Sequence, residues 1–470
     1  MYENLFKMCG YTDEEIEEQR PRIEKFLDRL GVHNEAAIKH AEKTVQLNYD
    51  VEMVSVRKLL WVFMASCIDA VLARDEHEYV INCNWPFPVQ MTLAMIDAAK
   101  EGGGKAWVGM PVQIFWMVGG TIFDILTPVL ERGELIGQPV GKAHCSQYQI
   151  YTGAIDMGIL PKPDLAIGSG WFCDQAAETE EMMSELYNYE IFYLDGLNEW
   201  QWNEWPDLNE RAVQYSANTI RLALERLKEL TGIETTNEQL KEGFKYVARW
   251  LYGMQNITRM IGTADPQPIS QANVNLPYGL WAIATEYRER AVEGLSDMVR
   301  EVKRKIDAGE GVVPKGAPRV YLALRTNVDT TPIRMVEELG LCLPTVFVDW
   351  LCPQELTKSK YTDPVDKIAE GLYRRPQLCS ADASMTYWKT VCKDWNMDAA
   401  IMFFAYNCRP WAIPPIMAKK DIQEELGIPC IVLEGDSYDT RNYNAQQLRT
   451  RLESFAEIVK MNKEMKAAAA

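Results

Sequence analysis

The sequence predicts an α/β protein with two open parallel-sheet domains and additional helical segments at the N-terminus and in the middle. Three observations support this prediction. Short apolar runs alternate with longer amphipathic stretches in two separate parts of the 470-residue chain, a pattern typical of strands and helices around a parallel sheet. The other parts carry helical apolar spacing. Apolar residues make up 47% and charged residues 25% of the chain, as in ordinary folded domains.

The first 78 residues are expected to form a helical N-terminal region. Between about Asp13 and Arg74, apolar residues recur three and four positions apart, which places them on one face of a helix. They include Ile23, Phe26, Leu27 and Leu30, followed by Val54, Val56, Leu59, Leu60 and Phe63.

Residues 79–207 are expected to form the first α/β domain. Its strand candidates are the short apolar runs at residues 79–84, 105–110, 164–169 and 190–195. Longer amphipathic stretches separate them, so the runs are predicted to be parallel strands joined by helices.

Residues 208–316 are expected to form a helical connecting segment. The stretch from Glu210 to Ala308 is almost wholly helix-like. Thr236 suits an N-cap ahead of Glu238, and Pro266 and Pro268 are expected to break the helical pattern once.

Residues 317–470 are expected to form the second α/β domain with a C-terminal helix. Strand candidates lie at residues 319–324, 345–350, 399–407 and 429–435, and a helix is expected at 332–340. The four final alanines are expected to be unstructured. Open parallel sheets of the kind predicted for both domains are Rossmann-like or flavodoxin-like.

Charge and hydropathy exclude several classes of partner. The chain has 49 Lys and Arg against 67 Asp and Glu, a net charge of −18, which repels phosphate backbones and anionic lipid. No uninterrupted apolar run approaches the roughly 20 residues of a membrane span, and the N-terminus lacks the apolar core of a secretory signal. We therefore expect a cytoplasmic protein that binds neither nucleic acid nor membrane.

Three cysteines occupy positions where parallel sheets bind ligands. Cys173 and Cys408 each follow a predicted strand and precede a helix, and Cys145 lies in a loop that enters a helix. Ligands of open parallel sheets bind beyond the carboxyl ends of the strands, and helix N-termini favour thiolates. These thiols could hold an iron-sulfur cluster. Because no CxxC pair is present and free cysteine is often a buried core residue, core packing is the alternative interpretation.

Three blocks of sequence resemble a known family. Residues 144–178 contain a first Cys and a strand that ends in Cys-Asp, residues 403–416 contain a third Cys, and residues 428–460 contain LEGD and TRLE. Together they resemble the 2-hydroxyacyl-CoA dehydratase and benzoyl-CoA reductase family, with a likeness from roughly Lys105 to Lys460. The segment GMPVQIFW departs from the family, which more often has a Pro-Glu pair where Val112 and Gln113 follow Pro111.

The resemblance implies a cofactor and a reaction. It implies a 4Fe-4S cluster held by Cys145, Cys173 and Cys408, with the fourth iron site left to water or substrate. The implied enzyme is the catalytic subunit of an ATP-dependent 2-hydroxyacyl-CoA dehydratase that works through a ketyl radical of its acyl-CoA substrate. It also implies two protein partners: a homologous second subunit, in a heterodimer, and a separate iron-sulfur ATPase that delivers the electron. The alternatives are an aromatic acyl-CoA reductase of the benzoyl-CoA type and, in a different class, a cluster-free interaction subunit.

Other residues are weaker candidates. His144, beside Cys145, is a candidate proton donor or a support for the cysteine loop. Glu434, Asp436 and Arg441 follow the last strand, where an ion-pair network and substrate contact are both compatible with the sequence. A second metal site is conceivable, although core packing is favoured for its candidate residues Cys342, Cys352, Cys379 and Cys392. Gly102, Gly103 and Gly104 precede a strand, so a turn is favoured over a phosphate loop.

Overall fold

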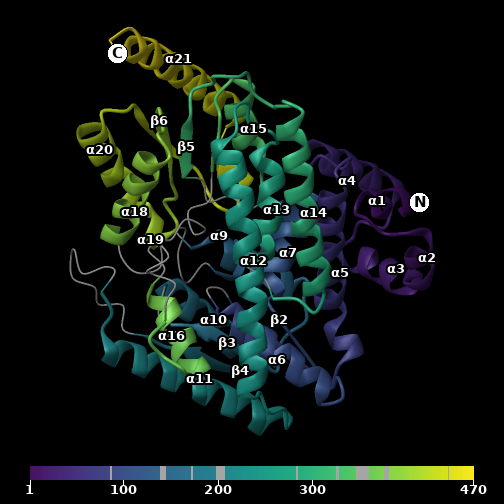
Figure 1. Cartoon of the computed structure of the whole chain (residues 1–470). Coiled ribbons are helices and arrows are strands. Elements are labelled where there is room, and N and C mark those ends of the chain that lie inside the picture. The colour runs from purple at the N-terminus through teal and green to yellow at the C-terminus, as the bar shows by residue number, and fades with distance from the viewer. Residues whose placement is uncertain are drawn as a thin grey trace.

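Two parallel sheets and a large helical layer make up this computed structural model (Figure 1). It describes residues 1–84, 87–137, 144–170, 173–196, 207–281, 284–323, 328–345, 359–374, 381–442 and 444–469. The predicted α/β class is confirmed. The predicted strand at 345–350 and the candidate metal ligands Cys352 and Cys379 fall wholly or almost wholly outside the described residues.

The N-terminal region is helical, as predicted. Its helices are α1 (Glu3–Met8), α2 (Asp13–Glu18), α3 (Arg20–Arg29), α4 (Glu35–Asn48) and α5 (Val54–Glu76). Thr12 and Glu15 form a capping box at the start of α2, and the Asn34 side chain caps α4, so local sequence fixes these two starts. Helix α5 is buried over most of its 23 residues because α3, α7 (Pro111–Thr121) and α14 (Arg288–Asp307) pack around it.

The first sheet has four parallel strands in the order β2-β1-β3-β4. The strands are β1 (Tyr79–Cys83), β2 (Ala106–Gly109), β3 (Leu165–Ser169) and β4 (Glu190–Leu194). The helices between them are α6 (Val89–Glu101), α7 (Pro111–Thr121), α8 (Leu126–Ile136), α9 (Ser146–Asp156) and α10 (Asp174–Tyr187). All four strands coincide with the predicted apolar runs, because strands buried inside a parallel sheet are continuously apolar.

The middle segment is helical, with more than the one expected break. Its helices are α11 (Glu210–Thr231), α12 (Asn237–Thr263), α13 (Gln271–Trp281) and α14 (Arg288–Asp307). Thr236 caps α12 as predicted, in a capping box with Gln239. The expected break at Pro266 and Pro268 separates α12 from α13. Two further breaks lie after Gly232, which adopts the left-handed conformation at the end of α11, and between α13 and α14. Helix α12 packs on α6 and α14, and α14 packs on α5, so the segment joins the N-terminal helices in one layer.

The second sheet has the order β5-β6-β7, again all parallel. Its strands are β5 (Val320–Ala323), β6 (Ala399–Phe404) and β7 (Cys430–Glu434). The helices of this part are α15 (Thr331–Glu338), α16 (Pro364–Tyr373), α18 (Ala381–Asp394), α19 (Arg409–Ala412), α20 (Pro414–Leu426) and α21 (Ala445–Ala469). Helix α16 packs on α11 and α12, beside the first sheet (Figure 1).

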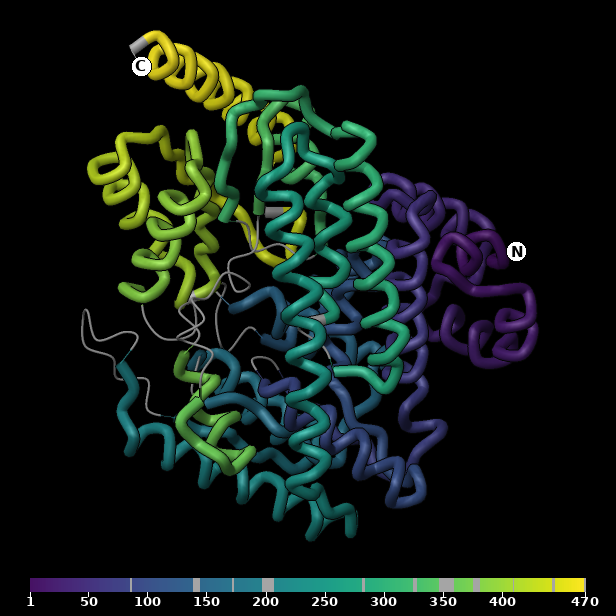
Figure 2. Tube along the Cα trace, viewed as in Figure 1, coloured from purple at the N-terminus to yellow at the C-terminus, as the bar shows by residue number. Residues whose placement is uncertain are grey.

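One expectation about the C-terminus was wrong. The final alanines were expected to be unstructured, but α21 continues to Ala469. Alanine has the highest helix propensity of all residues, so an alanine run extends a helix that packing has already started. Figure 2 shows the last turns of α21 extending away from the rest of the molecule. Among the described residues, no helix combines the length and the apolar character needed to span a membrane.

Candidate active site

Three of the nine described cysteines differ from the others in position and exposure. Cys145, Cys173 and Cys408 are partly exposed, while the other six are buried. Each of the three immediately precedes a helix: Cys145 precedes α9, Cys173 precedes α10 and Cys408 precedes α19. The structure therefore confirms the predicted position of these cysteines at loop-to-helix junctions.

The fold brings these three thiols together from both sheets. Burial raises the pKa of the Cys145 thiol well above its ordinary value, and the charges of Cys408 and Cys173 raise it further. Charges have such an effect only on groups that lie close to each other. Cys145 thus lies within electrostatic reach of Cys173 and of Cys408, although the three residues are far apart in the sequence.

Sheet topology explains the position of Cys173. The connections from β1 and β3 lead toward opposite edges of the first sheet, which makes the carboxyl ends of these strands a topological switch point. Ligands of open α/β sheets bind at such points. Cys173 follows β3, and Cys408 follows β6, the central strand of the second sheet.

Asp436 connects the two halves of the site. Its carboxylate accepts a short hydrogen bond from the hydroxyl of Ser146, beside Cys145, and one of 2.6 Å from Nδ2 of Asn407, beside Cys408. The backbone N–H groups of Tyr438 and Asp439 donate to the same carboxylate, at 2.9 and 3.3 Å. The side chain is buried, and burial raises its pKa. A single buried carboxylate therefore joins the loops of two cysteines.

The loop of Cys145 is also tied to the helix that starts at Cys173. The backbone N–H of Cys145 donates to Oε1 of Gln175 at 3.2 Å. One turn further along α10, the hydroxyl of Thr179 donates to the Gln175 carbonyl at 2.7 Å and lies 2.8 Å from Nε2 of His144. These contacts fix the position of the Cys145 loop relative to the start of the helix at Cys173.

His144 is a neutral side chain in this site. Burial lowers its pKa to about 4, and its ring stacks on Tyr148. Because the Thr179 hydroxyl uses its own proton on the Gln175 carbonyl, Nε2 of His144 carries the proton and donates it to Thr179. Within the described residues, Nδ1 has no hydrogen-bond partner.

The sequence did not distinguish ion pairing from substrate contact at the end of the last strand. Arg441 pairs with Asp439 at 2.7 Å and with Glu134 of α8 at 2.5 Å, so ion pairing accounts for it. Glu434 is exposed. The roles of Gln175 and Thr179 were missed, because polar residues inside an amphipathic helix carry no signal of which neighbour they will meet.

Core packing is confirmed for the other described cysteine candidates, and a turn is confirmed for the glycine run. Cys392 and Cys430 belong to a hydrophobic cluster that also contains Trp388 and Met402, and Cys342 is buried at the edge of β5. Gly103 and Gly104 adopt positive φ angles directly before β2, as a turn requires.

The chemistry of the three thiols fits an iron-sulfur cluster. In the part of the chain that the structure describes, no three His, Cys, Asp or Glu side chains form a ready ligand set for a metal ion. When Cys173 and Cys408 are ionised, their negative charges disfavour ionisation of Cys145. Cationic iron removes that repulsion, and thiolates are the usual ligands of such clusters. These residues could therefore hold a cluster through three sulfur ligands.

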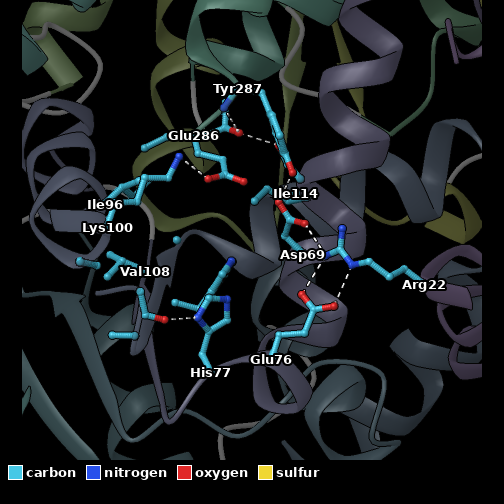
Figure 3. A pocket seen from close by; sticks show the side chains of 18 residues that line it. Arg22, Asp69, Glu76, His77, Ile96, Lys100, Val108, Ile114, Glu286 and Tyr287 are labelled. Carbon is cyan, nitrogen blue, oxygen red and sulfur yellow. Dashed lines mark hydrogen bonds and ion pairs between the residues drawn. The ribbon is translucent and has the colours of Figure 1, made fainter. Parts of the chain in front are cut away.

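A cavity of about 310 Å³ lies elsewhere, beside the edge strand β2, and none of the three cysteines lines it. Figure 3 shows its charged side chains already engaged with one another. Arg22 pairs with Asp69 at 2.8 Å and with Glu76 at 2.7 Å, and Lys100 pairs with Glu286. Tyr287 donates to Asp69 at 2.7 Å. The charges of this cavity thus serve to join α3, α5, α6 and the start of α14.

Comparison with known proteins gives a consistent match. The family model described as 2-hydroxyglutaryl-CoA dehydratase, D-component, matches residues 109–459. The α subunit of (R)-2-hydroxyglutaryl-CoA dehydratase from Acidaminococcus fermentans is 17% identical over 323 residues, which are 65% of this chain and 62% of that protein. The α subunit of (R)-phenyllactyl-CoA dehydratase from Clostridium sporogenes is 18% identical over 345 residues, 68% of this chain and 78% of that protein.

Proposed function

The chain belongs to the 2-hydroxyglutaryl-CoA dehydratase D-component family, and from this we propose that it is the catalytic subunit of a 2-hydroxyacyl-CoA dehydratase. The observation that supports the proposal most is the meeting of three thiols from two sheets within the matched residues. Both relatives are named for thioesters with a hydroxyl on the carbon next to the carbonyl, one with an acidic and one with an aromatic acyl group. We therefore assign the substrate class and leave the acyl group open.

Cys145, Cys173 and Cys408 are proposed to hold a 4Fe-4S cluster with one non-cysteine site. When bound, such a cluster supplies one electron at a time to the thioester carbonyl, which makes loss of the neighbouring hydroxyl feasible. The protein's own contribution is to exclude water and to fix the ligands. Asp436 does the latter for the loops of Cys145 and Cys408.

The proposed reaction requires partners. The relatives are named as α subunits, which supports a second, homologous subunit. The sequence has no phosphate-loop motif, so ATP hydrolysis is assigned to a separate iron-sulfur ATPase. A net charge of −18 favours a basic docking face on that partner and weaker docking at high salt.

Substrate screening tests the proposed function. The chain, reconstituted anaerobically with its second subunit and activating ATPase, should convert 2-hydroxyacyl-CoA thioesters to enoyl-CoA and leave benzoyl-CoA unchanged. Mass spectrometry of the CoA products measures both reactions. Reduction of benzoyl-CoA without any dehydration would instead place the chain with the aromatic acyl-CoA reductases. A complex without iron and without either activity would identify a cluster-free interaction subunit.

We propose that His144 positions the Cys145 loop, since its one ring proton is already donated to Thr179. His144→Gln should retain iron and most of the turnover, because glutamine can still donate a hydrogen bond to Thr179. His144→Ala should weaken cluster retention by about 10- to 100-fold, the range typical for groups that orient metal ligands. Iron analysis and turnover of both variants provide the measurement. Retained iron with an approximately hundredfold loss of turnover in His144→Gln would favour proton donation instead.

A further inference from the structure

A buried carboxyl group lies between the two helices that begin at Cys145 and Cys173. Glu180 is on α10, two turns beyond Cys173, and is 1% exposed. Oε1 accepts a short hydrogen bond from Nδ2 of Asn84, at the end of β1, and Oε2 accepts one of 3.0 Å from the hydroxyl of Tyr189. No arginine, lysine or histidine partner is recorded for this carboxyl group in the described part of the chain.

The hydrogen bonds continue from Glu180 toward α9. The hydroxyl of Tyr189 lies 3.4 Å from that of Tyr151. Tyr151 is one turn beyond Tyr148, and Tyr148 is under the electrostatic influence of Cys173, Cys145 and Glu180. A line of exchangeable protons thus runs through the space between the two helices that carry the first two cysteines.

Some buried polar side-chain atoms at the end of β1 lack well-aligned hydrogen bonds. Both amide atoms of Asn82 and the Oδ1 atom of Asn84 are buried without a well-aligned hydrogen bond in the described structure, and the Tyr151 hydroxyl is a polar side-chain group within reach of both residues. Each residue is 1% exposed. Buried amide groups are costly when unpaired, so water or a ligand is expected to complete them. They lie at the carboxyl end of β1, on the switch point where Cys173 also lies.

We propose that Glu180, Tyr189 and Tyr151 form a proton relay that serves the substrate site at the carboxyl end of β1. This inference rests on the proposed function. Dehydration of a 2-hydroxyacyl thioester breaks a C–H bond and a C–O bond, forms a C=C bond and releases water. The Glu180 acid first gives its proton through the relay to the departing hydroxide, which leaves as water. The Glu180 carboxylate then takes up, through the relay, the proton that the neighbouring carbon loses as the C=C bond forms. The acid is thereby regenerated, and no proton is gained or lost overall.

The surroundings of Glu180 suit this exchange. Burial raises its pKa to about 7, although hydrogen bonds from Tyr189, Asn84 and Tyr151 oppose the rise. The titratable groups that face it are tyrosine hydroxyls: Tyr148 and Tyr151 on α9, Tyr189 before β4 and Tyr193 on β4. Gly168 of β3 lies against the Glu180 side chain, so close that a Cβ there would contact its Cγ at 3.4 Å. A carboxyl that titrates near neutral pH is well matched to accept and return a proton.

The decisive variant is Glu180→Gln, assayed in the complete complex with its second subunit and ATPase. Glutamine keeps the size and a hydrogen-bonding group but carries no exchangeable acid proton. Turnover should fall by about a hundredfold, with iron content unchanged, and the limb of the pH–rate profile near pH 7 should disappear. Tyr189→Phe, which interrupts the relay and leaves the carboxyl in place, should lower turnover by about tenfold or more.

Glu337 provides a matched control. It is also a buried carboxyl whose pKa is raised by burial, and it accepts hydrogen bonds from Ser270, Gln267 and Gln271. The cysteine near it is Cys342, which is not one of the three proposed cluster ligands. Glu337→Gln should keep the pH–rate profile of the wild type. Infrared spectroscopy should detect a protonated carboxyl that titrates near pH 7 in the wild type and is missing in Glu180→Gln.

The outcomes separate the relay from the proposed function. Wild-type complex that turns over no 2-hydroxyacyl-CoA overturns both. Active wild type with an unchanged pH–rate profile in Glu180→Gln overturns the relay alone. Loss of iron in Glu180→Gln would also overturn the relay, because it would assign a structural role to the side chain.

Discussion

Cys408→Ser should remove most of the iron from the anaerobically purified protein and abolish turnover. The wild type is expected to carry about four iron atoms per chain, the content of one cubane cluster. Serine keeps the volume of cysteine but is a much poorer iron ligand, and two remaining thiolates cannot hold the cluster against exchange. Cys145→Ser and Cys173→Ser should behave in the same way. Iron and acid-labile sulfide analysis, together with the visible spectrum, gives the measurement.

Cys392→Ala is the matched control for this experiment. Cys392 is buried inside the hydrophobic cluster against which the partly exposed Cys408 packs. The variant should keep its iron, and any loss should be in stability alone. Wild-type protein with less than about half an iron per chain after reconstitution would contradict the cluster assignment, because one cubane cluster contains four iron atoms.

Asp436→Ala should have the second large effect, on stability and iron retention together. The substitution leaves four donors without their acceptor: the Ser146 hydroxyl, the Asn407 amide and the N–H groups of Tyr438 and Asp439. Unpaired buried donors cost about 1–3 kcal/mol each when water cannot reach them. Partial hydration reduces the sum, so we expect the free energy of unfolding to fall by about 3–5 kcal/mol. Urea denaturation measures it.

Ser146→Ala tests the hydrogen bond between Ser146 and Asp436 separately from the other hydrogen bonds that Asp436 accepts. It removes the one hydrogen bond from Ser146 to Asp436 and leaves the other three donors paired. Its cost should be about 1 kcal/mol, with a smaller loss of iron than in Asp436→Ala. Equal effects of the two substitutions would show that the contact with Ser146 accounts for the whole role of Asp436.

The family, and the placement of Cys145, Cys173 and Cys408 where a loop enters a helix, were predictable from the sequence. The resemblance carried by residues 144–178, 403–416 and 428–460 is confirmed by the family match. The strand before Cys173 and the strand before Cys408 are short apolar runs of the kind typical of a buried parallel sheet. The cofactor and its ligands stay predictions that the iron measurements will test.

Local pattern was sufficient wherever the determining interactions are local. Apolar period, capping residues and strand-like runs act over a few residues, so the seven described strands and the cap at Thr236 were derived from neighbouring sequence. The caps at Thr12 and Asn34, which were not predicted, are interactions of the same local kind. The C-terminal alanines were the exception, because their helix depends on the turns that precede them.

Only the tertiary structure decided which distant groups meet. Nothing around Asp436 indicates that it joins Ser146 and Asn407, and Glu180 follows a helical pattern that would equally suit an exposed position. Both depend on how α9, α10 and the strand ends pack across long sequence separations. Burial then changes the chemistry, since removing a carboxyl group from water raises its pKa. The sequence by itself therefore determined the elements and the family, while packing determined the contacts and proton affinities of the site.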